Sequence, residues 1–374
     1  MLDPSKFLSA LRDLNVNFFC GVPDSLLKDF CACVTSTLSE DEHIIAANEG
    51  AAVGLAIGRH IACDDIPLVY MQNSGLGNAI NPLLSLASSD IYGVPMLVML
   101  GWRGEPGKKD EPQHVHQGRV MNAMIESMEF ASVVLSDELD VAIAQTKDAA
   151  HLAKETASPV FIVVQKGTFE PFSLESKKSK LSLTREQAVI EVVKNAPKDA
   201  VFVSTTGMPS RELFEYRARS EFGHAQDFLT VGGMGHASQI ALGIALNRPE
   251  KKVICLDGDG AALMHLGSLA ISGQKSPGNL THIILNNGAH ASVGGQPTVG
   301  LDISFSKIAD GCGYRQIKSA RSAKEVAEAM NSFEPHVGSG MLEIQVLPGN
   351  RKDIGRPTTT PRENIVALKA FLHD

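Results

Sequence analysis

Acidic and amide side chains follow two short apolar runs in the second half of the chain. The run at residues 253–256 ends in the sequence D-G-D-G, and the run at 283–285 ends in N-N-G. Asp259 in the first ending offers a carboxylate, and Asn287 in the second offers an amide oxygen. Oxygen ligands of this kind suit Mg2+, which prefers a few protein ligands together with bound phosphates. The pattern therefore indicates a metal site beside a phosphate group.

The elements that would position these side chains form a strand-helix-strand unit. Both apolar runs are short and partly β-branched, which is typical of strands buried on both faces of a parallel sheet. The apolar residues between them recur about one helical turn apart, so they predict a helix. Gly260 and Ala261 would open this helix, where free backbone N–H groups can hold a diphosphate. The alternative is an ordinary unit without a ligand, because Asp, Gly and Asn are also common turn residues.

The composition of the chain argues against several classes of protein. Its 374 residues are 44% hydrophobic and 20% charged, enough to bury full cores, and the net charge is −8. Basic residues form no long run, which argues against nucleic-acid binding. No apolar stretch reaches the roughly 18 residues of a membrane span, and the N-terminus lacks the features of a signal peptide. The six cysteines form no C-x-x-C pair, so we expect reduced thiols and a cytoplasmic protein.

Strand and helix signals alternate through both halves of the chain. This alternation predicts an α/β fold with two doubly wound parallel-sheet domains, one at residues 1–170 and one at 185–374. Residues 171–184 are polar, rich in Lys and Ser and without apolar periodicity, and are expected to form a linker. A polar stretch at 104–118 is predicted to be a long loop, of a length that is usually functional or mobile.

Glu49 is the outstanding polar residue of the first half. It follows a strand-like run at residues 43–47 and precedes Gly50 and a helix of small side chains. A glutamate at this place can simply stabilise the N-terminus of the helix. The chain nevertheless offers one carboxylate in each half that follows an expected strand.

Together these motifs resemble those of thiamine-diphosphate (ThDP) enzymes, which carry GDG followed by NN and an N-E-x-A-A pattern around a glutamate. The resemblance implies thiamine diphosphate and Mg2+ as cofactors, with Glu49 as the carboxylic acid at the pyrimidine ring. The implied cofactor site consists of Glu49, Thr206, Gly232, Met234, Asp259, Gly260, Ala261 and Asn287, with Asp259, Asn287 and Ala289 as metal ligands. Met234 would support the bent cofactor beside the carbonyl of Gly232, although it could equally be a core residue.

Three further stretches resemble the phosphonopyruvate decarboxylase family of ThDP enzymes: G-V-P-D-S at 21–25, the region 101–118, and N-N-G-A-H-A-S-V-G-G-Q-P-T-V at 286–299. The resemblance covers essentially the whole chain and implies a pyrimidine domain and a diphosphate domain without a middle domain. It implies non-oxidative decarboxylation of a small phosphonate, 3-phosphonopyruvate, to phosphonoacetaldehyde and CO2 in phosphonate biosynthesis. The implied catalytic residues are Glu49, Asp24, Ser25, His114 and His116, and the implied substrate-binding residues are Ser25, Arg103 and Gln296.

The family resemblance also implies a homodimer or larger assembly in which Glu49 and Asp259 come from different subunits. Ala291 departs from the acidic or similar polar residue expected in the family, which leaves the donor of the final proton open. Sulfopyruvate decarboxylase is a close alternative, and a non-catalytic ThDP-binding subunit is another that Ala291 suggests. An NAD-dependent dehydrogenase is a third alternative, but no G-x-G-x-x-G follows a strand signal.

Overall fold

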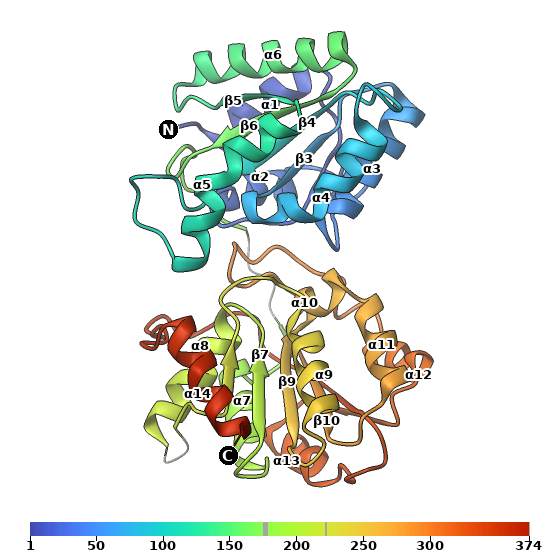
Figure 1. Cartoon of the computed structure of the whole chain (residues 1–374). Coiled ribbons are helices and arrows are strands. Elements are labelled where there is room, and N and C mark those ends of the chain that lie inside the picture. Colours follow the sequence, from blue (N-terminus) through green and yellow to red (C-terminus); the bar gives the residue numbers. More distant parts are fainter. Residues whose placement is uncertain (175–178, 221–222, 374) are drawn as a thin grey trace. The chain divides into compact units, whose positions relative to one another are not determined.

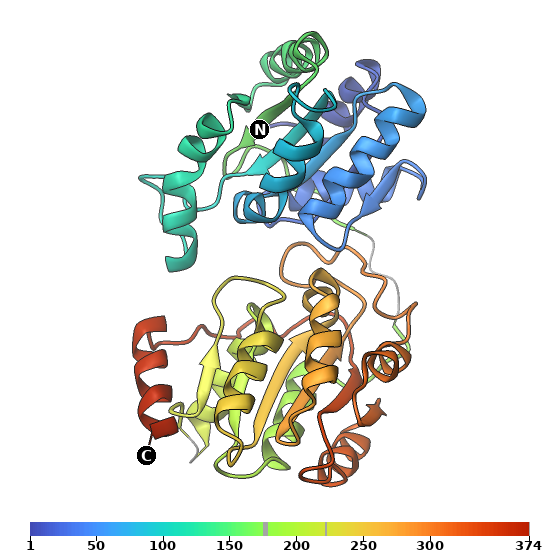
Figure 2. The ribbon, with the colours of Figure 1, turned by 45° about the vertical axis from the view of Figure 1, so that its right-hand side comes forward.

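The computed structural model describes residues 1–174, 179–220 and 223–373. The chain divides into two compact units (Figure 1, Figure 2). The N-terminal unit comprises Met1–Ser176 with Val293–Gln296, and the C-terminal unit comprises Lys177–Ser292 with Pro297–Asp374. Residues 175–178 of the expected linker lie outside the described residues, and the domain boundaries expected from the sequence stay predictions.

The N-terminal unit is built on a six-stranded parallel sheet with the strand order β2-β1-β3-β4-β6-β5. Its strands are β1 (Phe19–Gly21), β2 (His43–Ile45), β3 (Leu68–Gln72), β4 (Met96–Gly101), β5 (Ala131–Val134) and β6 (Pro159–Val164). Its helices are α1 (Pro4–Asp13), α2 (Lys28–Thr37), α3 (Glu49–Cys63), α4 (Leu76–Pro82), α5 (Pro112–Ser127) and α6 (Leu139–Thr156), and the short turns η1 (Asn73–Gly75) and η2 (Leu83–Ala87) flank α4.

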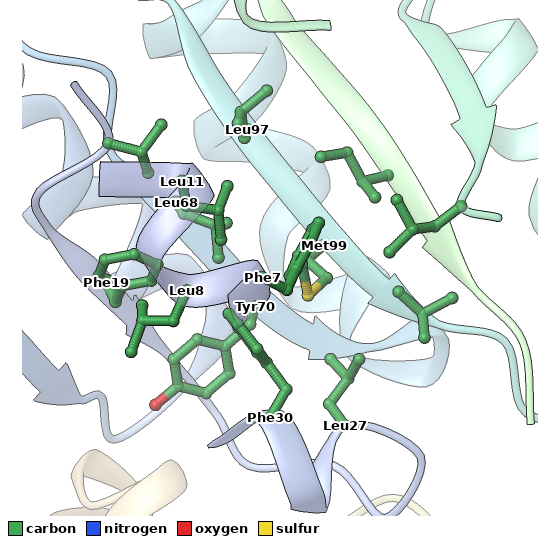
Figure 3. Close-up of a cluster of buried hydrophobic side chains, with 14 of the residues drawn as sticks. Phe7, Leu8, Leu11, Phe19, Leu27, Phe30, Leu68, Tyr70, Leu97 and Met99 are labelled. Atoms are coloured by element: carbon green, nitrogen blue, oxygen red, sulfur yellow. The ribbon is translucent and has the colours of Figure 1, made fainter. Parts of the chain in front are cut away.

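Helices cover both faces of this sheet. Side chains of α1, α2 and α6 pack on one face, in a buried cluster that includes Phe7 and Phe30 (Figure 3). The rings of Phe7 and Phe30 meet edge to face with their centroids 5.9 Å apart, a favourable aromatic geometry. Side chains of α3, α4 and α5 pack on the other face, around Leu76 and Met121. The two apolar layers fix the strands, and thereby the loops at the carboxyl ends of the strands.

The C-terminal unit repeats this design with the strand order β11-β12-β10-β9-β7-β8. Its strands are β7 (Val201–Ser204), β8 (Asp227–Leu229), β9 (Val253–Gly258), β10 (Leu280–Asn286), β11 (Gln316–Ala320) and β12 (Gly340–Gln345). Its helices are α7 (Arg185–Lys194), α8 (Met208–Arg219), α9 (Ala237–Asn247), α10 (Asp259–Met264), α11 (Gly267–Lys275), α12 (Phe305–Cys312), α13 (Ala323–Asn331) and α14 (Pro361–His373). Helices α7, α8 and α13 cover one face, and α9, α11, α12 and α14 cover the other.

Both sheets have the same topology when the strands of each unit are counted in chain order. The second strand lies at one edge, followed by the first, third, fourth, sixth and fifth. The chain therefore leaves the neighbouring first and third strands in opposite directions, and ligands of open α/β sheets bind outside the carboxyl ends at such a point. This point lies between β1 and β3 in one unit and between β7 and β9 in the other. The expected α/β fold of two doubly wound parallel sheets without a middle domain is confirmed for the described residues.

Two local expectations were wrong. The stretch at 104–118 is not one long loop, because α5 begins at Pro112 and only residues 102–111 connect it to β4. Proline fits the first turn of a helix, where no backbone N–H is needed. The helix expected after D-G-D-G is divided into α10 and α11, because His265 leaves the helical conformation with φ −130° and ψ 52°. None of the described helices is both long and apolar enough to cross a membrane.

Candidate active site

Asp259 lies directly after β9, at the switch point of the C-terminal sheet. It is 2% exposed, and its carboxylate accepts hydrogen bonds from the Thr298 hydroxyl and, at 3.4 Å, from the backbone N–H of Asn287. Burial raises the pKa of Asp259. Among the described residues, no Lys, Arg or His side chain forms an ion pair with this carboxylate. A buried carboxylate without a protein cation is a fitting ligand for Mg2+.

Asn287 follows β10, the strand next to β9, and is 5% exposed. Its Oδ1 accepts a hydrogen bond from the backbone N–H of Ala289 at 2.9 Å. The carbonyl of Ala289 accepts one from the N–H of Ala291 at 3.0 Å. The carboxylate of Asp259, the amide of Asn287 and the carbonyl of Ala289 are the kind of oxygen ligands that Mg2+ prefers.

Thr298 belongs to this site and was not expected from the sequence. Its backbone N–H donates to the carbonyl of Gly288 at 2.9 Å, and its hydroxyl accepts from the N–H of Gly300 at 3.1 Å. A methyl group added at Gly300 would lie 2.6 Å from a carboxylate oxygen of Asp259, so glycine is needed for this close approach. No local pattern marks Thr298, because its contact with Asp259 depends on the path of the whole loop.

Met234 and His290 lie beside the start of α10. A methyl group added at Gly260 would lie 3.5 Å from the Met234 methyl and 3.0 Å from the His290 ring. Burial lowers the pKa of His290, which was not expected from the sequence, to about 4, so its ring is neutral at pH 7. The other expected cofactor residues follow β7, β8 and β9 in turn: Thr206, Gly232 and Ala261.

Glu49 is the first residue of α3 in the N-terminal unit. The helix begins here because the Asn48 side chain accepts a hydrogen bond from the Ala51 N–H at 2.8 Å. Glu49 is 5% exposed, accepts a hydrogen bond from Asn78 Nδ2 at 2.8 Å, and has a pKa raised by burial. A methyl group added at Gly75 would lie 2.3 Å from Glu49 Oε1. The carboxyl group is therefore confined, whereas a glutamate that only stabilises a helix end is usually solvated.

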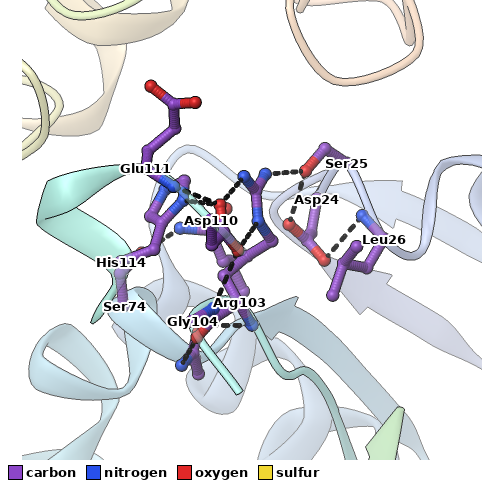
Figure 4. A network of polar contacts seen from close by, with 11 residues as sticks. Asp24, Ser25, Leu26, Ser74, Arg103, Gly104, Asp110, Glu111 and His114 are labelled. Atoms are coloured by element: carbon purple, nitrogen blue, oxygen red, sulfur yellow. Dashed lines mark hydrogen bonds and ion pairs between the residues drawn. The ribbon is translucent and has the colours of Figure 1, made fainter. Parts of the chain in front are cut away.

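Ser25 and Arg103 join the loops after β1 and β4 (Figure 4). Arg103 Nη1 donates to Ser25 Oγ at 2.5 Å, and the Ser25 hydroxyl donates to Asp24 Oδ1 at 3.4 Å. Asp24 is fully buried, accepts a hydrogen bond from the Leu26 N–H at 3.1 Å, and has a pKa raised by burial to about 6. A methyl group added at Gly101 would lie 1.9 Å from Asp24 Oδ2. Three of the expected residues thus form one connected group.

Asp110 extends this group to His114 and was not expected from the sequence. Its carboxylate accepts hydrogen bonds from Arg103 Nε at 2.8 Å, from Arg103 Nη2, and from His114 Nδ1 at 2.9 Å (Figure 4). Burial lowers the pKa of His114, although Asp110 opposes this shift. In the sequence K-K-D-E-P, Asp110 resembles one member of a solvated charge run, so only the folded loop indicates its role.

Two other expected residues lie apart from this group. His116 is exposed and its Nδ1 accepts a hydrogen bond from Arg119 Nη2 at 2.9 Å. It does not join His114, because residues two apart on a helix point to nearly opposite sides. Gln296 is fully buried in the N-terminal unit, where its Nε2 donates to the carbonyl of Lys28 at 3.4 Å. Its Oε1 is also buried and has no hydrogen-bond partner among the described residues.

A second polar cluster lies in the core of the C-terminal unit. Possible ligand atoms of Cys255, Asp257 and His282 lie within 4.8 Å of one another. The carboxylate of Asp257 pairs with His282 Nε2 at 3.3 Å and accepts a hydrogen bond from the Gly258 N–H at 3.1 Å. His282 Nδ1 lies 3.3 Å from the Tyr314 hydroxyl. These contacts account for both Asp257 oxygens and both ring nitrogens, so a hydrogen-bonded core network explains the cluster without a metal.

Comparisons with known protein families match both units. Residues 5–126 match the thiamine pyrophosphate enzyme, N-terminal TPP binding domain family, and residues 205–344 match the corresponding C-terminal TPP binding domain family. Thiamine pyrophosphate (TPP) is another name for thiamine diphosphate. The matches confirm the expected ThDP-binding fold and thiamine diphosphate as the cofactor.

Individual relatives match almost the whole chain. A phosphonopyruvate decarboxylase from Streptomyces viridochromogenes is 34% identical over 100% of this chain and 95% of its own length. One from Streptomyces hygroscopicus is 33% identical, over 99% and 94%. A sulfopyruvate decarboxylase from Methanosarcina acetivorans is 26% identical, over 92% and 91%. These similarities support a ThDP-dependent decarboxylase, a carboxy-lyase, over the dehydrogenase and the non-catalytic subunit. The chain therefore belongs to the phosphonopyruvate decarboxylase family of thiamine pyrophosphate enzymes.

Proposed function

We propose that this protein catalyses the ThDP- and Mg2+-dependent decarboxylation of 3-phosphonopyruvate to phosphonoacetaldehyde and CO2, in the cytoplasm and as a step of phosphonate biosynthesis. The observation that carries this proposal is the 34% identity to a phosphonopyruvate decarboxylase over the entire chain. Over the whole chain, the sulfopyruvate decarboxylase from Methanosarcina acetivorans is less similar, at 26%. The buried acids and the cationic group in the two units support the same chemistry.

The C-terminal unit would hold the metal and the diphosphate. Asp259, Asn287 and the carbonyl of Ala289 supply oxygen ligands for Mg2+, and the hydrogen bond from Thr298 orients the Asp259 carboxylate. Thr206 and the backbone N–H groups of Gly260 and Ala261 would bind the diphosphate oxygens. This assignment rests on a buried carboxylate that lacks a protein cation, because such a group is costly to bury unless a cation binds it.

The N-terminal unit would hold the pyrimidine ring. When bound, thiamine diphosphate supplies the electron sink that takes up the electron pair left behind as CO2 departs. Burial raises the pKa of Glu49, so its carboxyl group can keep a proton and donate it in a hydrogen bond to a ring nitrogen. Asn78 fixes the other carboxyl oxygen at 2.8 Å. The Gly232 carbonyl and the Met234 side chain of the C-terminal unit would support the bent shape of the cofactor.

The connected group around Arg103 would bind the substrate. Its guanidinium provides a cation for the phosphonate, with the Ser25 hydroxyl beside it. Asp24, with a pKa of about 6, can gain or lose a proton near neutral pH, and Ser25 connects it to Arg103. His114 and Gln296 would offer further polar contacts.

The test of this proposal is CO2 release from 3-phosphonopyruvate and from 3-sulfopyruvate, with ThDP and with or without Mg2+. We expect the larger kcat/KM for 3-phosphonopyruvate, loss of the reaction when Mg2+ is chelated, and a strongly impaired Glu49→Gln variant. Equal rates for the parent and Glu49→Gln would remove Glu49 from the chemistry. A larger kcat/KM for 3-sulfopyruvate would assign the protein to the sulfonate substrate instead.

A homodimer or larger assembly, with Glu49 and Asp259 contributed by different subunits, is part of the proposal. Glu49→Gln and Asp259→Asn can each be prepared separately and then mixed under conditions that exchange subunits. If the two residues act across subunits, the mixed dimer contains one intact site and regains activity. Mixed dimers that stay inactive, or a fully active monomer in sedimentation experiments, would contradict this arrangement.

A further inference from the structure

The Asp110 carboxylate accepts five hydrogen bonds, and the proposed function gives it no role of its own. Its carboxylate accepts from Arg103 Nε and Nη2, from the Gly104 N–H at 2.8 Å, from the Glu111 N–H at 2.7 Å and from His114 Nδ1 at 2.9 Å. Burial alone would disfavour the charged carboxylate, but these donors hold the pKa of Asp110 well below its usual range. A substrate anion could displace the Asp110 carboxylate only by breaking all of these hydrogen bonds. Asp110 is therefore a fixed part of the site.

The contacts of Asp110 determine how the Arg103 side chain is presented. A guanidinium is a planar fork of donors, and a carboxylate that binds it along one edge fixes its plane. Asp110 binds the Nε and Nη2 edge, so Nη1 points to Ser25 Oγ at 2.5 Å. The Asn73 side chain also fixes the backbone of Arg103, by donating to its carbonyl at 2.8 Å. Arg103 keeps 18% of its side chain exposed, so part of it remains accessible to a ligand.

We propose that Asp110 is a positioning residue for substrate binding. It holds Arg103 so that Nη1 and the Ser25 hydroxyl together bind the tetrahedral oxyanion at the far end of a 2-oxo acid. This inference rests on the proposed function and adds the residue that orients the anion-binding group. Asp110 touches Arg103, and Arg103 touches the substrate.

Replacing Asp110 should tighten anion binding if Asp110 acts only through its charge, and weaken it if Asp110 positions Arg103. The direction of the change in Kd therefore tests the inference. If Asp110 only neutralised Arg103, replacing it with Asn would leave a stronger positive charge and tighten the binding of an anion. If Asp110 positions Arg103, the same replacement releases the guanidinium from its orientation and weakens the binding. Because charge-assisted hydrogen bonds are worth about 1.5–3 kcal/mol, the positional loss is expected to be about tenfold or more.

The experiment compares the full-length parent with Asp110→Asn, Asp110→Glu and Asp65→Asn. Asp65 provides the control, since its Oδ2 accepts hydrogen bonds from Arg59 Nε and Nη2, at 2.8 and 2.7 Å, elsewhere in the same unit. Three quantities are measured: the Kd of phosphonoacetate by calorimetry, and KM and kcat for 3-phosphonopyruvate. For Asp110→Asn we expect the Kd and KM to rise about tenfold or more while kcat changes less than about threefold. Asp65→Asn should leave Kd, KM and kcat unchanged.

Asp110→Glu keeps the charge but displaces the carboxylate by one methylene group, and we expect a smaller rise in Kd and KM. This variant also replaces Asp110→Asn as the deciding measurement if the latter does not fold. A Kd in Asp110→Asn equal to or tighter than that of the parent, or an unchanged Kd in Asp110→Glu when only that variant folds, would overturn the inference. Absence of turnover with any anionic 2-oxo acid would instead contradict the proposed function, whereas the phosphonoacetate Kd still reports on Asp110.

Discussion

Gly75→Ala should displace the Glu49 carboxyl group without changing its chemistry. Gly75 has an ordinary φ of −74°, so alanine introduces no backbone strain there. Its methyl group would lie 2.3 Å from Glu49 Oε1 and 2.6 Å from the carboxyl carbon. Ordinary contact begins at 3.4 Å, so the Glu49 side chain must move by about 1.1 Å. Displacements near 1 Å in a catalytic site can cost on the order of 10²-fold in rate.

The expected result combines a large loss of activity with a moderate loss of stability. Glu49 is buried and hydrogen-bonded to Asn78, so the added methyl group overpacks the site, and the free energy of unfolding should fall by about 1–3 kcal/mol. The kcat/KM for decarboxylation should fall on the order of 10²-fold. Decarboxylation kinetics at saturating ThDP and Mg2+, together with urea unfolding, provide both values.

Gly77→Ala is the matched control for this prediction. Gly77 lies two residues later in α4, and a methyl group added there meets no atom within 4 Å. Alanine in a helix stabilises by roughly 0.5–1 kcal/mol relative to glycine, so this variant should keep full activity and gain slightly in stability. If Gly75→Ala were as active as Gly77→Ala, the position of the Glu49 carboxyl group would not matter for catalysis, and the assignment of Glu49 would fail.

Three further predictions concern other polar groups. Thr298→Val removes the hydroxyl donor to Asp259, and calorimetry should show Mg2+ affinity about 10–100-fold lower; unchanged affinity would exclude this orienting role. Glu212→Gln leaves Arg185 buried without its bidentate partner, so urea unfolding should show a loss of about 3–5 kcal/mol; a loss below about 1 kcal/mol would contradict it. The pKa of Asp24 is raised from 3.8 to about 6, so its contribution to stability falls as pH rises from about 4 through 6, and Asp24→Asn should gain up to about 3 kcal/mol over the parent at pH 8 compared with pH 4. A stability difference independent of pH would contradict that sign.

The sequence predicted the parts of the site that depend on local order along the chain. Asp259 and Asn287 each follow an apolar strand, and parallel strands bring their carboxyl ends to the same edge of a sheet. Asp110 and Thr298 could not be predicted, because their contacts with Arg103 and Asp259 depend on how irregular loops return to the sheet. His116 was grouped with His114 because the stretch was expected to be a loop, whereas α5 separates the two side chains.

The edge strands β5 and β11 have weak sequence patterns. Strand β5 lies at the edge of its sheet and is mostly exposed, so it lacks the continuous apolar run of the central strands. Strand β11 is also an edge strand with partly exposed side chains. Helix α13 begins with a capping box at Ser322 and Glu325, a signal that the sequence contains and that would have located it.

The identical strand order of the two sheets has a consequence for how such a protein can be encoded. Every strand pair and every hydrophobic cluster of the described residues lies within one unit or the other. Interrupting the gene between the codons for Phe172 and Leu183 would therefore break no ladder and open no core. Two shorter genes, one for each sheet with its helices, could supply the same pair of folds, and only Val293–Gln296 would then be encoded with the other unit.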